Sequence, residues 1–105
     1  MTGHTHLRAG DYTAARTALA LALDHLPPTD RRGRILTLTD LATAEVHVGN
    51  VPDACRYATT AADLLQRTPY ATGTTHLRAF RAIAARPIGP RALRVLDEHL
   101  AQLAA

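Results

Sequence analysis

Apolar residues recur at intervals of three and four along most of the 105-residue chain, which is the spacing of one face of an α-helix. Four stretches that contain proline, three of them with glycine or a second proline, interrupt this pattern, at positions 27–28, 49–52, 68–69 and 87–90. The interruptions leave pieces of ordinary helix length. The pattern therefore predicts an all-α fold of about five helices in a single domain that spans residues 1–105.

The expected helices follow from the limits of these pieces. The first runs from about Thr13 to His25, the second from about Arg31 to Val48 and the third from Pro52 to about Gln66. A fourth follows cap candidates at 72–75, and a fifth follows residue 90. Each expected helix carries a row of apolar residues at helical spacing, and we expect these rows to face inward. In chain order, the rows of the five helices are Ala15, Leu19, Ala22 and Leu26; Ile35, Leu38, Leu41, Ala42 and Val46; Ala54, Ala58, Ala61 and Leu65; Leu77, Phe80, Ile83 and Ala84; and Leu93, Leu96, Leu100 and Leu103.

Local signals support the start of two of these helices and the charge pattern of their outer faces. Thr29 and Asp30 are good N-cap residues for the second helix, and Pro52 suits the first turn of the third. Opposite charges three or four residues apart are expected to pair on exposed faces, where each pair contributes a few tenths of a kcal/mol. These pairs are Asp53–Arg56, Asp63–Arg67 and Arg94–Glu98.

Composition narrows the class of protein. The chain has 21 alanines and 15 leucines but only one Phe, three Tyr and no Trp, a composition that disfavours an all-β sandwich or barrel. No apolar stretch approaches the roughly 20 residues of a membrane span. One cysteine cannot form an internal disulfide framework, and no basic-then-apolar leader opens the chain. We therefore expect a cytoplasmic protein that does not interact with a membrane.

The charge pattern does not indicate a nucleic-acid-binding protein. All twelve basic residues are arginine, and nine acidic residues are interspersed among them, which leaves a net charge of +3. Excess arginine and alanine together are typical of a GC-rich genome, so the choice of arginine is not by itself a sign of phosphate recognition. No aromatic residues interleave with the arginines for base stacking. We do not expect direct binding to nucleic acid.

An internal repeat is the most informative feature of the sequence. A shift of 39 residues aligns the run Gly10–Ala15 with the run Gly49–Ala54, and it also places Ala22 on Ala61 and Leu26 on Leu65. Each copy reads as a helix, a tight turn at a glycine and a second helix with small residues at its crossing point. The repeat predicts antiparallel helix hairpins in three units, at about 1–28, 29–68 and 69–105, although the third lacks the turn motif.

These residues resemble the tetratricopeptide repeat family. The central copy matches its pattern at Leu41–Ala42, Gly49, Ala54 and Ala61, and the first copy at Gly10, Tyr12, Ala15, Ala22 and Pro27, whereas Glu45 stands where that family has tyrosine. The resemblance implies a fragment of an α-solenoid. Stacked helix pairs of this kind present a concave surface that holds a peptide or a partner helix.

A narrower resemblance covers most of the chain from Gly10 onward. The segments at 26–32, 38–44 and 49–54 are similar to the C-terminal helical region of actinobacterial Xre-type helix-turn-helix regulators, in which a DNA-binding domain precedes such repeats. That domain is absent here, and the nine residues before Gly10 are too few for the first helix of a repeat. The resemblance implies the regulatory tail of such a regulator, either free-standing or truncated.

Motifs for catalysis are not recognisable. His4 and His6 are two residues apart, but no further ligand motif completes a metal site. Cys55 lies in the first turn of a helix and His47 on the preceding one, yet a small buried residue is typical of this position in helical repeats. There is no glycine-rich phosphate loop and no nucleophile elbow. We expect no enzymatic activity, no metal and no cofactor.

The sequence therefore predicts an interaction module whose partner is a protein or peptide. The expected contact surface is the polar stripe Thr39, Thr43 and His47, with Thr37 and Asp40 nearby and a basic cluster adjacent at Arg31, Arg32 and Arg34. Three alternatives or additions remain open. In the first, the module senses a small ligand or peptide and acts on a separate DNA-binding partner. In the second, the chain is a non-functional gene remnant. In the third, it self-associates through the open ends of the array.

Overall fold

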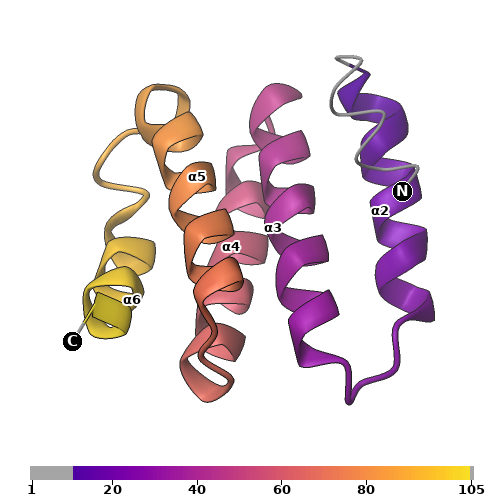
Figure 1. Cartoon of the computed structure of the whole chain (residues 1–105). Helices are drawn as coiled ribbons and strands as arrows, with labels where there is room; N and C mark the ends of the chain where they lie inside the picture. Colours follow the sequence, from indigo (N-terminus) through magenta and orange to yellow (C-terminus); the bar gives the residue numbers. More distant parts are fainter. Residues whose placement is uncertain (1–10, 105) are drawn as a thin grey trace.

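The computed structural model describes residues 11–104, and this part of the chain contains five helices and no strand (Figure 1). The helices are α2 (Tyr12–His25), α3 (Arg31–His47), α4 (Val51–Arg67), α5 (Ala71–Ile88) and α6 (Arg94–Ala104). The all-α prediction and four of the five predicted helix positions are confirmed to within a few residues. Within the described part of the chain, no helix is both long and apolar enough to cross a membrane. The predictions for His4, His6 and Gly10 lie outside it.

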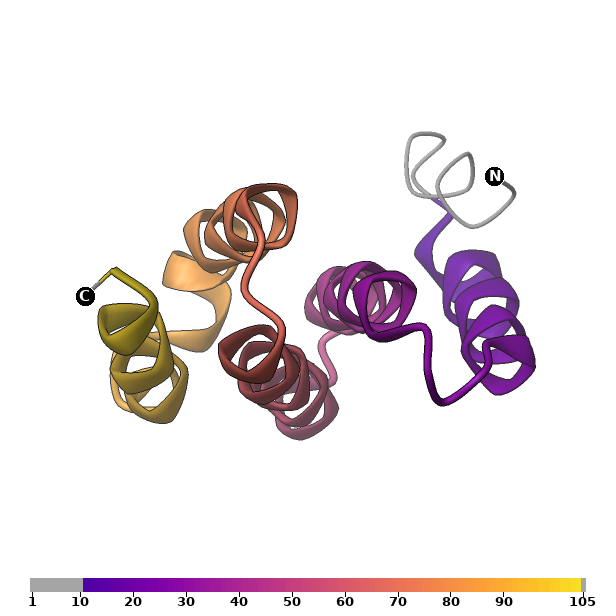
Figure 2. The same ribbon diagram turned by 60° about the horizontal axis from the view of Figure 1, so that its bottom comes forward.

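Consecutive helices run antiparallel and form two layers (Figures 1 and 2). One layer holds α3 and α5, the other holds α4 and α6, and α2 packs on α3 on the side away from α5. Helix α3 is central, because it packs against α2, α4 and α5, while α4 packs in addition against α6. The array measures 35 × 33 × 19 Å, so each helix has neighbours on only part of its surface.

The two caps that the repeat aligns have the same backbone conformation. Asp11 caps α2 with φ −91° and ψ 79°, and Asn50 caps α4 with φ −92° and ψ 75°. The Asp11 carboxylate accepts a hydrogen bond from the backbone N–H of Ala14 at 3.0 Å. Asp30 caps α3 in the same way, through the N–H of Gly33 at 3.0 Å, as its sequence predicted. The three helices α2, α3 and α4 therefore begin with the same cap conformation, which is compatible with the 39-residue register but is not specific to it.

Glycine ends α3 where the sequence placed the turn. Gly49 has φ +82°, and its N–H donates to the carbonyl of Val46 while the N–H of Asn50 donates to that of Glu45. These two bonds form a Schellman motif, which satisfies carbonyls at the helix end. Gly89 has φ +87° and ends α5, one residue beyond the 39-residue register. The third unit thus has a turn glycine that the alignment missed.

Most predicted inward residues form the core. All four alanine and leucine positions predicted for α4 are fully buried, and Phe80 is the largest buried side chain. Four predictions were wrong: Ala22 is exposed, Leu26 and Leu103 are half-buried, and Ile83 is 42% exposed. Helix α2 lies at one end of the array and packs mainly on α3, so Ala22 has no helix to cover it, and Ile83 likewise remains exposed on α5.

Helix α5 begins earlier than predicted. Its N-cap is Tyr70, with extended backbone, and the threonines expected as caps lie inside its first turn. Close packing at Gly73 explains this start, because a Cβ there would lie 2.5 Å from the Tyr70 ring and 2.9 Å from Leu65. Glycine lets the helix approach the end of α4, while Tyr70 covers the contact.

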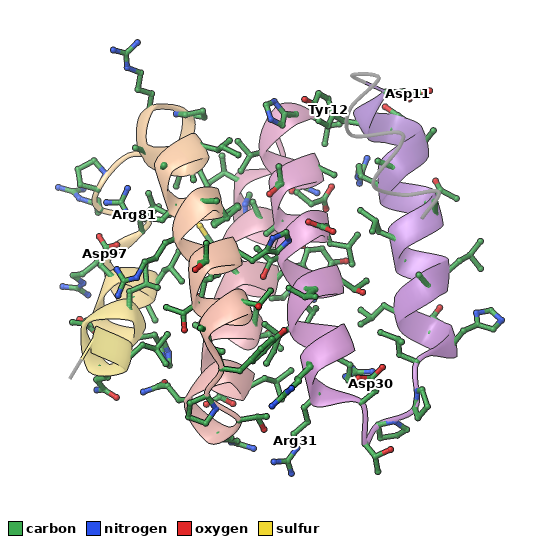
Figure 3. The ribbon with its side chains drawn as sticks, in the orientation of Figure 1. Asp11, Tyr12, Asp30, Arg31, Arg81 and Asp97 are labelled. Atoms are coloured by element: carbon green, nitrogen blue, oxygen red, sulfur yellow. The ribbon has the colours of Figure 1, made fainter. Side chains whose placement is uncertain are left out.

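Two of the three predicted ion pairs form. The pairs Asp53–Arg56 and Asp63–Arg67 lie on α4, at 3.0 and 3.2 Å. The third prediction, Arg94–Glu98, was wrong, since neither residue takes part in an ion pair within residues 11–104. Instead Arg81 donates two hydrogen bonds to Asp97, at 2.6 and 3.1 Å, and joins α5 to α6 (Figure 3). This pair spans two helices and was invisible to a rule based on short spacing.

Candidate functional site

The predicted contact stripe on α3 is only partly exposed. Thr39 is 1% exposed, and its hydroxyl donates to the carbonyl of Ile35 at 2.7 Å, so its place on a contact surface was wrong. The cause is the packing of α3 on several helices at once, which buries more of its circumference than one stripe. Thr43 is half-buried and donates to the carbonyl of Thr39 at 3.1 Å, while His47 is exposed.

His47 and Cys55 have separate partners. The imidazole of His47 stacks on the ring of Tyr12, with centroids 4.0 Å apart and planes inclined by 14°. This contact joins the end of α3 to the start of α2. The thiol of Cys55 faces the carbonyl of Ala92 at 3.7 Å, and burial raises the pKa of this thiol. A raised thiol pKa disfavours the reactive thiolate.

The basic cluster at the start of α3 supports the turn between α4 and α5. Arg31 donates to the hydroxyl of Thr68 at 3.3 Å, and the guanidinium of Arg32 lies 4.9 Å from the centre of the Tyr70 ring. The Tyr70 hydroxyl donates in return to the carbonyl of Arg32 at 3.1 Å. Arg34 is half-buried. Two of these arginines thus already have partners within the fold.

A groove of about 480 Å³ lies between α3 and α5. Helix periodicity places one row of residues from each helix along it, three to four positions apart. The end of α2 closes one side. The lining residues are Leu26, Asp30, Gly33, Leu36, Thr37, Asp40, Thr72 and His76. Thr37 and Asp40 were expected near the contact surface, whereas the sequence did not single out Leu36, Thr72 or His76.

A histidine–aspartate pair spans this groove. The Nε2 atom of His76 on α5 lies 2.7 Å from Oδ1 of Asp40 on α3, and the two side chains are 33% and 14% exposed. The hydrogen bond to Asp40 raises the pKa of His76, although burial acts in the opposite direction. The imidazole therefore carries a positive charge at a higher pH than a free histidine. The two residues are 36 positions apart, whereas the 39-residue register aligns Asp40 with Ala79, so the repeat alone did not indicate this pair.

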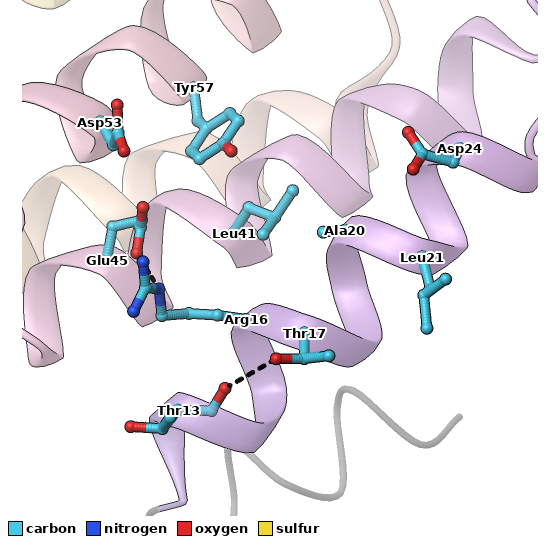
Figure 4. A pocket seen from close by; sticks show the side chains of 10 residues that line it. All are labelled: Thr13, Arg16, Thr17, Ala20, Leu21, Asp24, Leu41, Glu45, Asp53 and Tyr57. Carbon is cyan, nitrogen blue, oxygen red and sulfur yellow. Dashed lines mark hydrogen bonds and ion pairs between the residues drawn. The ribbon is translucent and has the colours of Figure 1, made fainter.

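A second groove, of about 460 Å³, lies between α2 and α4 with α3 at its floor (Figure 4). Glu45 of α3 is 2% exposed there and forms an ion pair with Arg16 of α2. The amide Nδ2 of Asn50 donates to Glu45 at 3.2 Å and to Asp53 at 2.8 Å, so it bridges the two carboxylates. Burial raises the pKa of Glu45, and Arg16 opposes this effect.

Neither groove has the parts of a recognisable catalytic centre. The α3–α5 groove is lined by carboxylates and one imidazole. The α2–α4 groove is lined by carboxylates and one guanidinium. In the described part of the chain, no three His, Cys, Asp or Glu side chains are grouped so that they could hold a metal ion. The arrangement suits reversible contact through apolar walls and paired charges.

Comparisons with protein-family models, with curated proteins and with solved structures give no match.

Proposed function

We propose that this chain is a non-catalytic interaction module that binds a segment of a protein or peptide in the groove between α3 and α5. The observation that carries the proposal is the groove itself, where two half-buried leucines, Leu26 and Leu36, flank one charged pair. Apolar surface supplies most of the binding free energy in such a site, and a few polar groups orient the ligand.

The repeat supports a tetratricopeptide-like arrangement. Helices α3 and α5 are the first helices of successive units in the 39-residue register, and they lie side by side in one layer. In an α-solenoid, the first helices of the units line the concave surface. The groove would then occupy the face that a peptide reaches, and Thr43 and His47 would extend the same helix surface beyond it.

The wider role that we propose rests on the sequence resemblance. The module would act in the cytoplasm as the regulatory tail of a transcriptional regulator, or as a truncated form of one. Self-association is part of the proposal, because Leu21 of α2 is 56% exposed and Val95 of α6 is 46% exposed. These residues belong to the two helices that lie at opposite ends of the array.

A second candidate is the sensing of a small ligand. The volume of the α3–α5 groove lies within the roughly 300–1,000 Å³ of known small-molecule sites, and this observation favours the candidate. A thermal-shift screen of small metabolites distinguishes the two. A compound supports sensing if it raises the melting temperature of the chain and if this effect is lost when Leu36 is substituted. Binding of peptides without any such compound supports the interaction module.

Selection from a random peptide display library tests the main proposal. We expect a family of related sequences, and we expect Leu36→Asp to abolish their binding because it places a second carboxylate near Asp40. Ile83→Asp is the matched control, because Ile83 lies on α5, is 42% exposed and does not line the groove. Failure to select any family, or equal binding to both variants, would contradict the proposal.

A further inference from the structure

The groove between α2 and α4 interrupts the regular packing of the array. Helices α4 and α6 pack directly against each other, and so do α3 and α5. Helices α2 and α4 occupy the corresponding position one unit earlier, yet they make at most sparse contact. Space of about 460 Å³ opens between them, and Glu45 lies at its floor (Figure 4).

The repeat identifies what distinguishes this interface. In the 39-residue register, Glu45 corresponds to Ala84, which is fully buried, and Arg16 corresponds to Cys55. Small neutral residues thus stand at the two positions of the next unit that correspond to the charged pair of the first. A buried ion pair is often no more stabilising than an apolar pair of similar volume, so packing alone does not account for the charges.

Negative charge predominates in the groove. Asp24, Glu45 and Asp53 come from three different helices, and Arg16 is the one guanidinium among the lining residues, so three negative charges face one positive charge. Asp53 also pairs with Arg56 at 3.0 Å, and this guanidinium lies 4.5 Å from the centre of the Tyr57 ring, which lines the groove, so a second cation is close to the three carboxylates. This local excess of negative charge contrasts with the net charge of +3 for the whole chain.

The buried carboxylate retains capacity for a further donor. The side chain of Glu45 is 3% exposed; its Oε1 faces Arg16 in the ion pair, and its Oε2 accepts one hydrogen bond from the amide of Asn50 at 3.2 Å. A carboxylate accepts about four hydrogen bonds in total. Burial already raises the pKa of Glu45, which means that its negative charge is incompletely compensated.

The walls of the groove are apolar. Leu21, Leu41, Ala20 and the ring of Tyr57 line it between the carboxylates. Arginine and lysine side chains lay their methylene stems along such surface while the charged head contacts a carboxylate. We propose that the α2–α4 groove binds a basic peptide segment, with one cationic head beside Glu45 and Asp53 and a second beside Asp24.

The spacing of the carboxylates sets the geometry of the probe. Arg16, which pairs with Glu45, and Asp24 are eight residues apart on α2, which is about 12 Å at 1.5 Å per residue. Four residues of extended peptide span about 13 Å. The probe is therefore the acetylated and amidated pentapeptide Arg-Ala-Ala-Ala-Arg, and its control replaces both arginines by citrulline, a neutral residue of nearly the same shape.

Titration of the full chain by NMR spectroscopy or calorimetry tests the site. We expect the arginine peptide to bind about a hundredfold more tightly than the citrulline peptide, the combined effect of two charge-assisted hydrogen bonds of about tenfold each. Glu45→Gln and Asp24→Asn, which each remove one of these contacts, should each weaken binding about tenfold. Asp63→Asn, which removes an exposed carboxylate of α4 that does not line the groove, should leave binding unchanged.

Three outcomes would overturn this site. They are equal binding of the two peptides, unchanged binding by folded Glu45→Gln and Asp24→Asn, and an equal loss on Asp63→Asn, which would indicate general charge attraction. Asp24 is exposed, so its substitution decides the matter if Glu45→Gln does not fold. The site is independent of the α3–α5 groove, and Leu36→Asp should not affect it.

Discussion

Removal of the Arg16 side chain should destabilise the fold far more than removal of its partner. In Arg16→Ala, Glu45 stays buried without its cation. Breaking a buried pair in this way costs about 3–5 kcal/mol, and because Arg16 is 39% exposed we expect a smaller loss of about 1–3 kcal/mol. In Glu45→Ala, by contrast, the freed guanidinium reaches water, and alanine already stands at the corresponding position 84. That change should cost less than about 1 kcal/mol.

The pH dependence identifies the cause of the loss. Arg16 lowers the pKa of Glu45 against the effect of burial, so its removal raises that pKa further. When the pKa of a carboxyl group is higher in the folded state than in the unfolded state, where it is 4.5 here, the group stabilises the fold at pH values below the unfolded pKa. This stabilisation is lost as the pH rises through the folded pKa. The deficit of Arg16→Ala relative to wild type is therefore greatest at neutral pH and shrinks as the pH approaches 4.5.

Urea unfolding followed by far-ultraviolet circular dichroism measures these differences. Arg67→Ala is the matched control, because it breaks an exposed pair with Asp63 and should cost only a few tenths of a kcal/mol. A loss for Arg16→Ala no larger than that of the control would refute the argument. So would a deficit that persists unchanged on acidification.

Three further predictions concern single positions. Gly49→Ala should lower the free energy of unfolding in urea by about 1–2 kcal/mol, because φ is +82° there. Gly89→Ala should lower it more, because φ 87° with ψ 163° is essentially restricted to glycine. Equal or negligible losses for the two variants would contradict this prediction. The NMR titration of His76 should give a pKa above 6.5, and this pKa should fall in Asp40→Asn. The stability that the pair contributes should be complete below pH 6.5 and should be lost as the pH rises through the pKa of His76 in the folded state. A pKa that the substitution leaves unchanged would refute the pairing. Cys55 should react with iodoacetamide more slowly than free cysteine, since its pKa is raised, and reaction at the free rate would contradict its burial.

Features that depend on local sequence were predicted well. The cap at Asp30, the proline in the first turn of α4 and the turn at Gly49 each depend on residues within a few positions, and all three are confirmed. The buried face of α4 was also correct, because α3, α5 and α6 pack against the side of this helix that carries its apolar residues.

Features that depend on the position of an element in the array were not predicted. Ala22 and Ile83 have the right spacing for a buried face but no helix to cover them. Thr39 failed in the opposite sense, since α3 is buried on more sides than an amphipathic pattern implies. The pair Asp40–His76 was hidden because its members lie 36 residues apart, although the repeat brings their helices together.

Mapping a selected peptide onto the chain by NMR chemical-shift perturbation tests the central claim most directly. If the α3–α5 groove is the binding surface, the largest changes should occur at Leu36, Asp40 and His76, and Leu36→Asp should eliminate them. Changes concentrated at Cys55 and Val95, which line a separate hollow between α4 and α6, would contradict the claim.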